Sequence, residues 1–152
     1  NAVQKKLLTS GLWRKAEATV GIADTIEDIR VVTNHSASVV LVAEQHHRIV
    51  GSVIGTFDGW RGKIYRLAVD PDYRRQGLAR KLVDEVVNRL VTMGAKRITA
   101  LVEKDHPWAV GFWGSQGYQL DQAIVRYVQN LCFLSPCRDG EQKLKSDGWQ
   151  LS

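Results

Sequence analysis

The spacing of apolar residues along the chain changes several times, and each change marks an expected element. Residues 2–18 carry apolar side chains at helical spacing, which predicts a helix that a central Ser-Gly pair can interrupt. A second, short helix is expected over 24–34. At its start, Asp24 is the expected N-cap and Glu27 stands in the capping-box position.

Three β-branched runs follow, separated by short polar connections. They predict strands, because β-branched residues fit a pleated, partly buried surface. Since the connections are too short for a crossover, an antiparallel meander is expected. The expected strands are 38–44, 48–57 and 64–70.

The period changes again after Pro71. Apolar residues recur every four positions over 77–93, which predicts a long amphipathic helix ended by Gly94. Residues 96–103 form a further expected strand. Because a helix separates it from strand 64–70, the two strands are expected to lie parallel through a right-handed crossover.

The last expected elements are a short helix over 107–117, with proline in its first turn and glycine at its C-cap, and a strand over 123–131. This order of elements predicts an α/β fold of the α+β type, with a mixed, mostly antiparallel central sheet. A single domain is expected over 1–131. The tail that follows, 132–152, has a polar composition typical of disorder.

Composition narrows the class of protein. With 152 residues, of which 44% are hydrophobic and 24% charged, the chain fits one compact domain. No apolar run approaches the ~20 residues of a membrane span and no signal-peptide pattern is seen, so a cytoplasmic protein without membrane contact is expected. In that reducing compartment Cys132 and Cys137 are expected as free thiols. The net charge of +5 suits nucleic acid, a membrane surface or a phosphorylated cofactor equally well.

The segment DPDYRRQGLAR concentrates positive charge where the long helix begins. A helix N-terminus already carries unsatisfied N–H groups and partial positive charge, so further cations there are unfavourable unless an anion is bound. Gly77 permits close approach of a ligand to the main chain, and Ala79 keeps the next turn small. The segment therefore predicts a phosphate site, with a solvated basic helix start as the alternative. The arginines concerned are Arg74, Arg75 and Arg80.

At these residues the chain resembles the GNAT superfamily of N-acetyltransferases. The family's acetyl-CoA-binding motif, Q/R-x-x-G-x-G/A, is matched by Arg74, Gly77 and Ala79 within RLAVDPDYRRQGLARKLV. The segment VLVAEQHHRIVGSVIGTFDGWRGKIYRLAVDP is similar to the family's meander, and VEKDHPWAVGFWGSQGYQ is similar to its late segment. The resemblance covers roughly residues 24–131.

The resemblance implies how acetyl-CoA is held. In the family, helices cover both faces of the sheet and two parallel strands splay apart. A bulge in the first of them frees main-chain groups for the pantetheine arm and for the thioester carbonyl. The matching strand residues here are Leu67, Ala68 and Val69. The pyrophosphate lies on loop amides that match Arg75, Gln76, Gly77, Leu78 and Ala79, with Arg80 adjacent. No metal is implied.

The implied reaction transfers an acetyl group to a primary amine, which needs a base because such amines are mostly protonated at neutral pH. Glu103, at the end of strand 96–103, is the candidate base, with a solvated glutamate as the alternative. Trp113 stands where the family often carries a tyrosine general acid, and an indole cannot act as that acid. His106 replaces the asparagine that assists the pantetheine arm, so His106 and Trp113 are counted with the cofactor-binding residues. Tyr118 is expected to be a core aromatic.

Two functions fit this pattern: an N-acetyltransferase that uses acetyl-CoA, with an acceptor that the sequence does not name, or a CoA-binding module with weak or no catalysis. A nucleic-acid-binding domain is disfavoured, because no aromatic and basic face is evident. The family's first strand is either missing here or replaced by the N-terminal run. A missing strand would expose a sheet edge, which favours a homodimer that covers it. Trp13, Trp60 and Trp108 either line the acceptor pocket or are partly buried aromatics.

Overall fold

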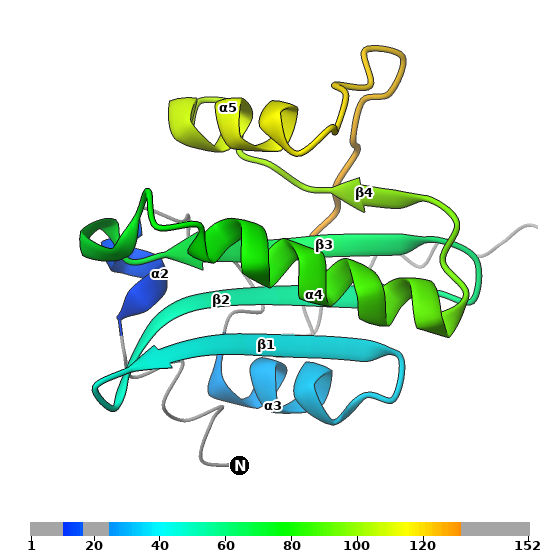
Figure 1. Cartoon of the computed structure of the whole chain (residues 1–152). Coiled ribbons are helices and arrows are strands. Elements are labelled where there is room, and N and C mark those ends of the chain that lie inside the picture. The colour runs from blue at the N-terminus through cyan, green and yellow to red at the C-terminus, as the bar shows by residue number, and fades with distance from the viewer. Residues whose placement is uncertain (1–10, 17–24, 132–152) are drawn as a thin grey trace, which may run out of the picture. The chain divides into compact units, whose positions relative to one another are not determined.

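The computed structural model describes residues 11–16 and 25–131. The chain divides into two units, residues 1–120 and 121–152, and the first contains all the described helices and strands. Four strands form one sheet in the order β1-β2-β3-β4 (Figure 1). They are β1 (Ser38–Gln45), β2 (Arg48–Phe57), β3 (Gly62–Val69) and β4 (Ile98–Ala100).

The pairing of the strands confirms the predicted topology. β1 with β2 and β2 with β3 are antiparallel, whereas β3 and β4 are parallel and are connected through α4 (Leu78–Met93). As predicted, α4 begins after Gly77 and ends at Gly94. The β1–β2 hairpin turns at His46 and His47, whose φ angles of 48° and 60° are those of a two-residue hairpin turn.

Helices cover both faces of the sheet, as the fold class predicts. α4 lies across one face (Figure 1), and its Val86 belongs to the core cluster on that side. On the other face, Ile29 of α3 (Ile26–Asn34) packs in a second cluster with Ile54 of β2 and with residues of α2 (Leu12–Lys15). The remaining helices are η1 (Pro71–Tyr73) and α5 (Pro107–Ser115).

Small residues of β2 bring α4 close to the sheet. A Cβ atom added at Gly55 would lie 2.5 Å from Cγ2 of Val86, so the helix approaches the strand more closely than a side chain there would permit. Val86 and Leu90 are fully buried in this contact. The packing fixes α4 over the sheet and thereby fixes the position of its first turn.

The start of α3 corrects one prediction. The N-cap is Thr25 rather than Asp24. The Thr25 hydroxyl accepts from the N–H of Asp28, and the Asp28 carboxylate accepts from the N–H of Thr25, each at 3.2 Å. This reciprocal capping box replaces the predicted pair with Glu27 and starts the helix one residue later, with Ile29 buried.

Two later elements are shorter than predicted. β4 covers Ile98–Ala100 instead of 96–103, because its pairing with β3 ends where the N–H of Leu101 donates to the carbonyl of Ile64 at 3.1 Å. Beyond that point β3 continues to Val69, but its residues are not paired with those that follow β4. α5 ends at Ser115, so the predicted extent to 117 is also too long.

The predicted strand over 123–131 is wrong. These residues form no strand, and their large apolar side chains are mostly exposed; Tyr127, for example, is 93% exposed. Their β-branched composition favours an extended chain, but propensity alone forms no strand without a hydrogen-bonded neighbour.

Several expectations lie wholly or partly outside the described residues. α2 occupies four residues of the predicted helix 2–18, and the rest of that segment lies mostly beyond the description. The same holds for the tail 132–152 with both cysteines, and for any strand before α2. Among the described helices, none combines the length and apolar character that crossing a bilayer requires.

Candidate functional site

The connection from β3 to α4 forms an open loop with an unusual backbone. Arg75 and Gly77 have φ angles of 63° and 79°, both in the left-handed region. Gly77 is the N-cap of α4, and it makes no side-chain cap to the helix. A Cβ atom added at Gly77 would meet nothing within 4 Å, so the space beside this glycine is open. Successive turns of this kind create concave groups of N–H donors that suit anions.

β3 contains the bulge that the family resemblance implies. Ser52 pairs with Ala68, whereas Ile54 pairs with Tyr65, so two residues of β3 lie opposite one residue of β2. Arg66 lies in this bulge with a φ angle of 53°. The bulge is therefore a built feature of the strand that leads to the loop.

The implied splay of the parallel strands is present as well. Pairing between β3 and β4 runs from Gly62↔Ile98 to Ile64↔Ala100, but β3 continues to Val69. The predicted pantetheine contacts, Leu67 to Val69, lie in this extension, next to the bulge. The bulge, the strand extension and the open loop thus follow one another in a single stretch of chain.

Arg74 braces the loop rather than extending into solvent. Its Nε donates to the carbonyl of Val69 at 3.3 Å, and a terminal nitrogen donates to the carbonyl of Ala16 at 3.4 Å. Its guanidinium carbon lies 4.8 Å from the ring centroid of Trp108. The side chain of Arg74 therefore connects the end of β3, the end of α2 and the start of α5. Arg75 and Arg80 are exposed.

A buried carboxylate fixes the turn before the loop. Asp70 is 2% exposed, and it accepts from Nζ of Lys15 at 2.8 Å and from the N–H of Asp72 at 3.0 Å. Burial alone would raise the pKa of Asp70, but these two hydrogen bonds outweigh it and lower the pKa below its ordinary value. Hydrogen bonds to Asp70 and Asp72 raise the pKa of Lys15. The turn is thus tied to α2 by a charged pair.

A second contact between α2 and the sheet lies directly at the bulge. Nε1 of Trp13 donates to the hydroxyl of Ser52 at 3.0 Å, and both residues are buried. The hydroxyl of Ser52 donates to the carbonyl of Arg66 at 3.4 Å. The guanidinium carbon of Arg66 lies 5.1 Å from the ring centroid of Trp13. Sequence reasoning missed this group, because the indole and the hydroxyl are 39 positions apart.

The late segment supplies the remaining predicted residues. Glu103 is exposed in the connection between β4 and α5, and its carbonyl accepts from the N–H of His106 at 3.2 Å. Nε2 of His106 accepts from Nε1 of Trp108 at 3.0 Å, which links this histidine to the aromatic ring beneath Arg74. The structure therefore brings His106 toward the loop through Trp108.

Trp113 belongs to the α4-side core cluster and is 8% exposed. Its ring meets that of Tyr118 edge to face, with centroids 4.7 Å apart. Burial and the charge of Asp84 raise the pKa of Tyr118, which packs against the same cluster, as a core aromatic does. The third tryptophan of the sequence analysis, Trp60, is 70% exposed and stacks on Arg61 in the β2–β3 hairpin.

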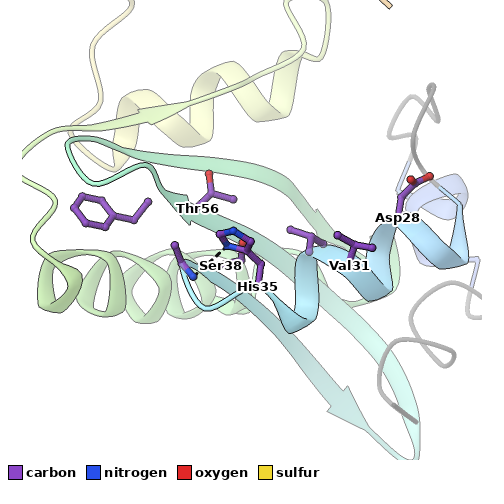
Figure 2. Close-up of a pocket in the computed structure, with 8 residues that line it drawn as sticks. Asp28, Val31, His35, Ser38 and Thr56 are labelled. Carbon is purple, nitrogen blue, oxygen red and sulfur yellow. Dashed lines mark hydrogen bonds between the residues drawn. The ribbon is translucent and has the colours of Figure 1, made fainter. Parts of the chain in front are cut away.

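A separate cavity of about 360 Å³ lies between α3 and the strands β1 and β2 (Figure 2). Two of its polar residues are already engaged: Asp28 in the cap of α3, and Nδ1 of His35, which accepts from the N–H of Ala37 at 3.2 Å. It contains none of the predicted site residues. Its lining consists of Asp28, Val31, Val32, His35, Ala37, Ser38, Thr56 and Phe57.

Comparisons with known proteins agree on one family. The family model described as "Acetyltransferase (GNAT) family" matches residues 8–118. An acetyltransferase of Yersinia pestis (strain Pestoides F) is 33% identical over 114 residues, which is 75% of this chain and 81% of that protein.

Solved structures share the fold. An aminoglycoside acetyltransferase from an uncultured soil metagenomic sample, in complex with trehalose, has a TM-score of 0.68 and 22% identity, over 84% of this chain and 89% of that one. A structure of AAC(6')-Iy in complex with a bisubstrate analogue built on CoA has a TM-score of 0.66 and 12% identity, over 82% and 91%. At these identities the likeness concerns the fold.

Proposed function

The chain belongs to the GNAT acetyltransferase family, and from this premise we propose that it transfers an acetyl group from acetyl-CoA to a primary amine by direct attack. Membership of the family implies acetyl-CoA as the donor. The observation that carries the proposal is one continuous stretch of chain: the bulge of β3, the extension of β3 beyond its last pair with β4, and the open loop before α4.

The loop is suited to a diphosphate. The left-handed residues Arg75 and Gly77 shape the turn, and the space beside Gly77 admits a ligand to the main chain. The first N–H groups of α4 carry partial positive charge, and the exposed Arg75 and Arg80 add charge-assisted donors. Arg74 serves this site by holding the loop against Val69 and Ala16. We assign the pyrophosphate to the amides of residues 75–79.

The reaction is a direct acyl transfer. The amine nitrogen forms a bond to the thioester carbonyl carbon, the C–S bond breaks, and the sulfur leaves with that electron pair as a thiolate. A main-chain N–H beside the bulge stabilises the negative charge that develops on the carbonyl oxygen. Because a thiol has a pKa of about 8.5, the thiolate is a tolerable leaving group without a tyrosine acid. Glu103 is the group we assign to take the proton from the attacking amine.

Two of the solved structures described above are aminoglycoside acetyltransferases or carry an acetylneamine-based ligand. The name of each refers to an acceptor that carries amino groups, an aminoglycoside or neamine. These names support an amine acceptor for the present chain. The identity of the acceptor does not follow from the fold.

The test combines two measurements on the same protein. Calorimetric titration with CoA measures binding, and release of free thiol from acetyl-CoA over a panel of primary amines measures transfer. Binding together with amine-dependent thiol release is the expected result. Tight CoA binding with no turnover on any amine would instead favour a binding module, and no CoA binding would contradict the site.

A further inference from the structure

The buried hydroxyl of Ser52 lies between a tryptophan and the bulge of β3. Ser52 is 0% exposed and is one of the two buried polar or charged residues among those described, the other being Asp70. The neighbouring cluster on this face of the sheet is otherwise apolar apart from the indole nitrogen of Trp13 and the hydroxyl of Tyr65. An alanine would fill this position without burying a polar group, so the cost of burying the hydroxyl must be offset by the hydrogen bonds that it makes.

The chemistry of the two side chains fixes the direction of the hydrogen bonds. An indole N–H can only donate, so the oxygen of Ser52 must accept from Trp13 at 3.0 Å. The hydroxyl hydrogen is then available for the carbonyl of Arg66, which lies 3.4 Å from the same oxygen. Trp13 therefore orients the Ser52 hydroxyl toward one particular peptide group of the bulge.

That peptide group also carries the N–H of Leu67. The peptide bonds of the described residues are all trans, and a trans peptide directs its carbonyl and its N–H to opposite sides. The Arg66 carbonyl is held toward Ser52, which belongs to β2. The N–H of Leu67 is consequently directed away from the Ser52 hydroxyl. It lies in the part of β3 beyond Ile64, where no β4 residue pairs with the strand.

We propose that Trp13 and Ser52 are positioning residues that aim the N–H of Leu67 at the thioester carbonyl. The proposal rests on the function proposed above and deepens it. Arg66 has a left-handed backbone with a φ of 53°, which residues other than glycine rarely adopt. This conformation therefore needs support from its surroundings. The hydroxyl bond to its carbonyl and the stacking of its guanidinium on Trp13 supply that support from one side of the sheet.

The test uses Ser52→Ala, which removes the hydroxyl, and Trp13→Phe, which keeps an aromatic ring and removes the N–H donor. The matched control is Ile29→Val, which trims a buried side chain of the same cluster and changes no polar group. Each variant is measured for kcat with acetyl-CoA, for the dissociation constant of CoA, for the melting temperature, and for the amide nitrogen shift of Leu67 by NMR.

Removal of an oxyanion donor lowers kcat by about 100- to 1,000-fold, so misdirecting one is expected to lower kcat by about tenfold. Both variants should show this loss with little change in CoA affinity, and the double variant should be no slower than the slower single one, because the two residues act through one bond. Ile29→Val should lower the melting temperature and leave kcat unchanged.

Two results would overturn the proposal. If Ser52→Ala and Trp13→Phe lower the melting temperature but turn over at the wild-type kcat, the cluster serves stability alone. The second result comes from the NMR measurement, which tests the positioning role separately from turnover. If the wild-type protein shows no turnover, the proposed function fails and the NMR measurement alone decides the positioning role. In that case a Leu67 shift that moves in both variants but not in Ile29→Val supports it, and an unmoved shift contradicts it.

Discussion

Two residues of the candidate site other than glycine have a left-handed backbone. Besides the two histidines of the β1–β2 turn, the non-glycine residues with positive φ are Arg66 and Arg75 among those described. Each such residue carries a conformational penalty of roughly 1–2 kcal/mol. The hairpin needs this geometry for its turn, whereas Arg66 and Arg75 mark the bulge and the open loop, where strain is typical of functional sites.

Gly77 gives the sharpest single-residue prediction. Asparagine and aspartate both tolerate the left-handed region, so Gly77→Asn and Gly77→Asp form a pair that differs in charge alone. The Asp variant places a carboxylate in the open space and is expected to bind CoA about tenfold or more weakly than the Asn variant, measured by calorimetry. Equal affinities of the two variants for CoA would contradict the assignment of the pyrophosphate to this loop.

Glu103 tests the assignment of the base. Glu103→Gln keeps the shape of the side chain and removes its ability to take a proton. We expect kcat to fall on the order of 100-fold near neutral pH, with the CoA dissociation constant unchanged, and with a loss shrinking at high pH where the amine is already neutral. If the Glu103→Gln variant has the same kcat as the wild type at pH 7 in steady-state assays, Glu103 is not the base.

Asp70 predicts a pH dependence of stability. Its pKa in the folded state lies below the unfolded value of about 3.9, so its contribution is complete above that value and is lost as the pH falls through the folded-state pKa. Asp70→Asn should lower the free energy of unfolding at pH 7 by about 1–2 kcal/mol, because a charged hydrogen bond is lost. In urea unfolding, the difference from wild type should shrink below pH 4.

The matched control for Asp70 is Asp72→Asn. Asp72 binds the same lysine at 2.9 Å, but its side chain is 75% exposed, so a smaller loss is expected. A difference between wild type and Asp70→Asn that stays constant from pH 7 to acid pH would show that the carboxylate charge contributes nothing.

At the scale of elements, the contact between α4 and β2 is the one that places the loop. Gly55→Ala would bring a methyl group to 2.5 Å from Val86, and the overpacking should lower the free energy of unfolding by about 1–3 kcal/mol. Gly111→Ala is the control, because a Cβ atom there meets nothing within 4 Å and alanine favours a helix. Denaturant unfolding measures both, and equal stability of the two variants would contradict the close approach.

Local patterns predicted the elements whose signals lie within their own sequence. The four-residue repeat of α4 and the β-branched runs of the meander are confirmed, because amphipathic spacing reports directly on which face is buried. The cap of α3 was placed one residue too early, because Asp24 and Thr25 are both good N-caps and the choice depends on which partner three residues later returns a bond.

Features that depend on pairing or on distant contacts were harder to predict. The composition of 96–103 and 123–131 favours strands, yet β4 is short and the second segment forms none, because strand formation needs a neighbour. The loop of the site is predicted from the local segment 70–80 and from the family motif within it. Its supports, Lys15 on Asp70 and Trp13 on Ser52, join parts of the chain that no local pattern connects.

At the scale of the molecule, the two faces of the sheet have different tasks. α4 and its core cluster position, from one face, the loop that we assign to the pyrophosphate. α2, on the other, reaches the end of β3 through Lys15 and the bulge through Trp13. The stretch assigned to acetyl-CoA is therefore held from both sides, which is what a site needs to present main-chain groups in fixed directions.

The central claim is that CoA binds along the end of β3 and at the start of α4. The most direct test is to map the amide chemical shifts of the protein during titration with CoA. The account predicts saturable shifts in two groups of main-chain amides, those of residues 67–69 in β3 and those of residues 75–79 at the start of α4. Shifts confined to the cavity between α3 and the first two strands, or no saturable shifts at all, would contradict it.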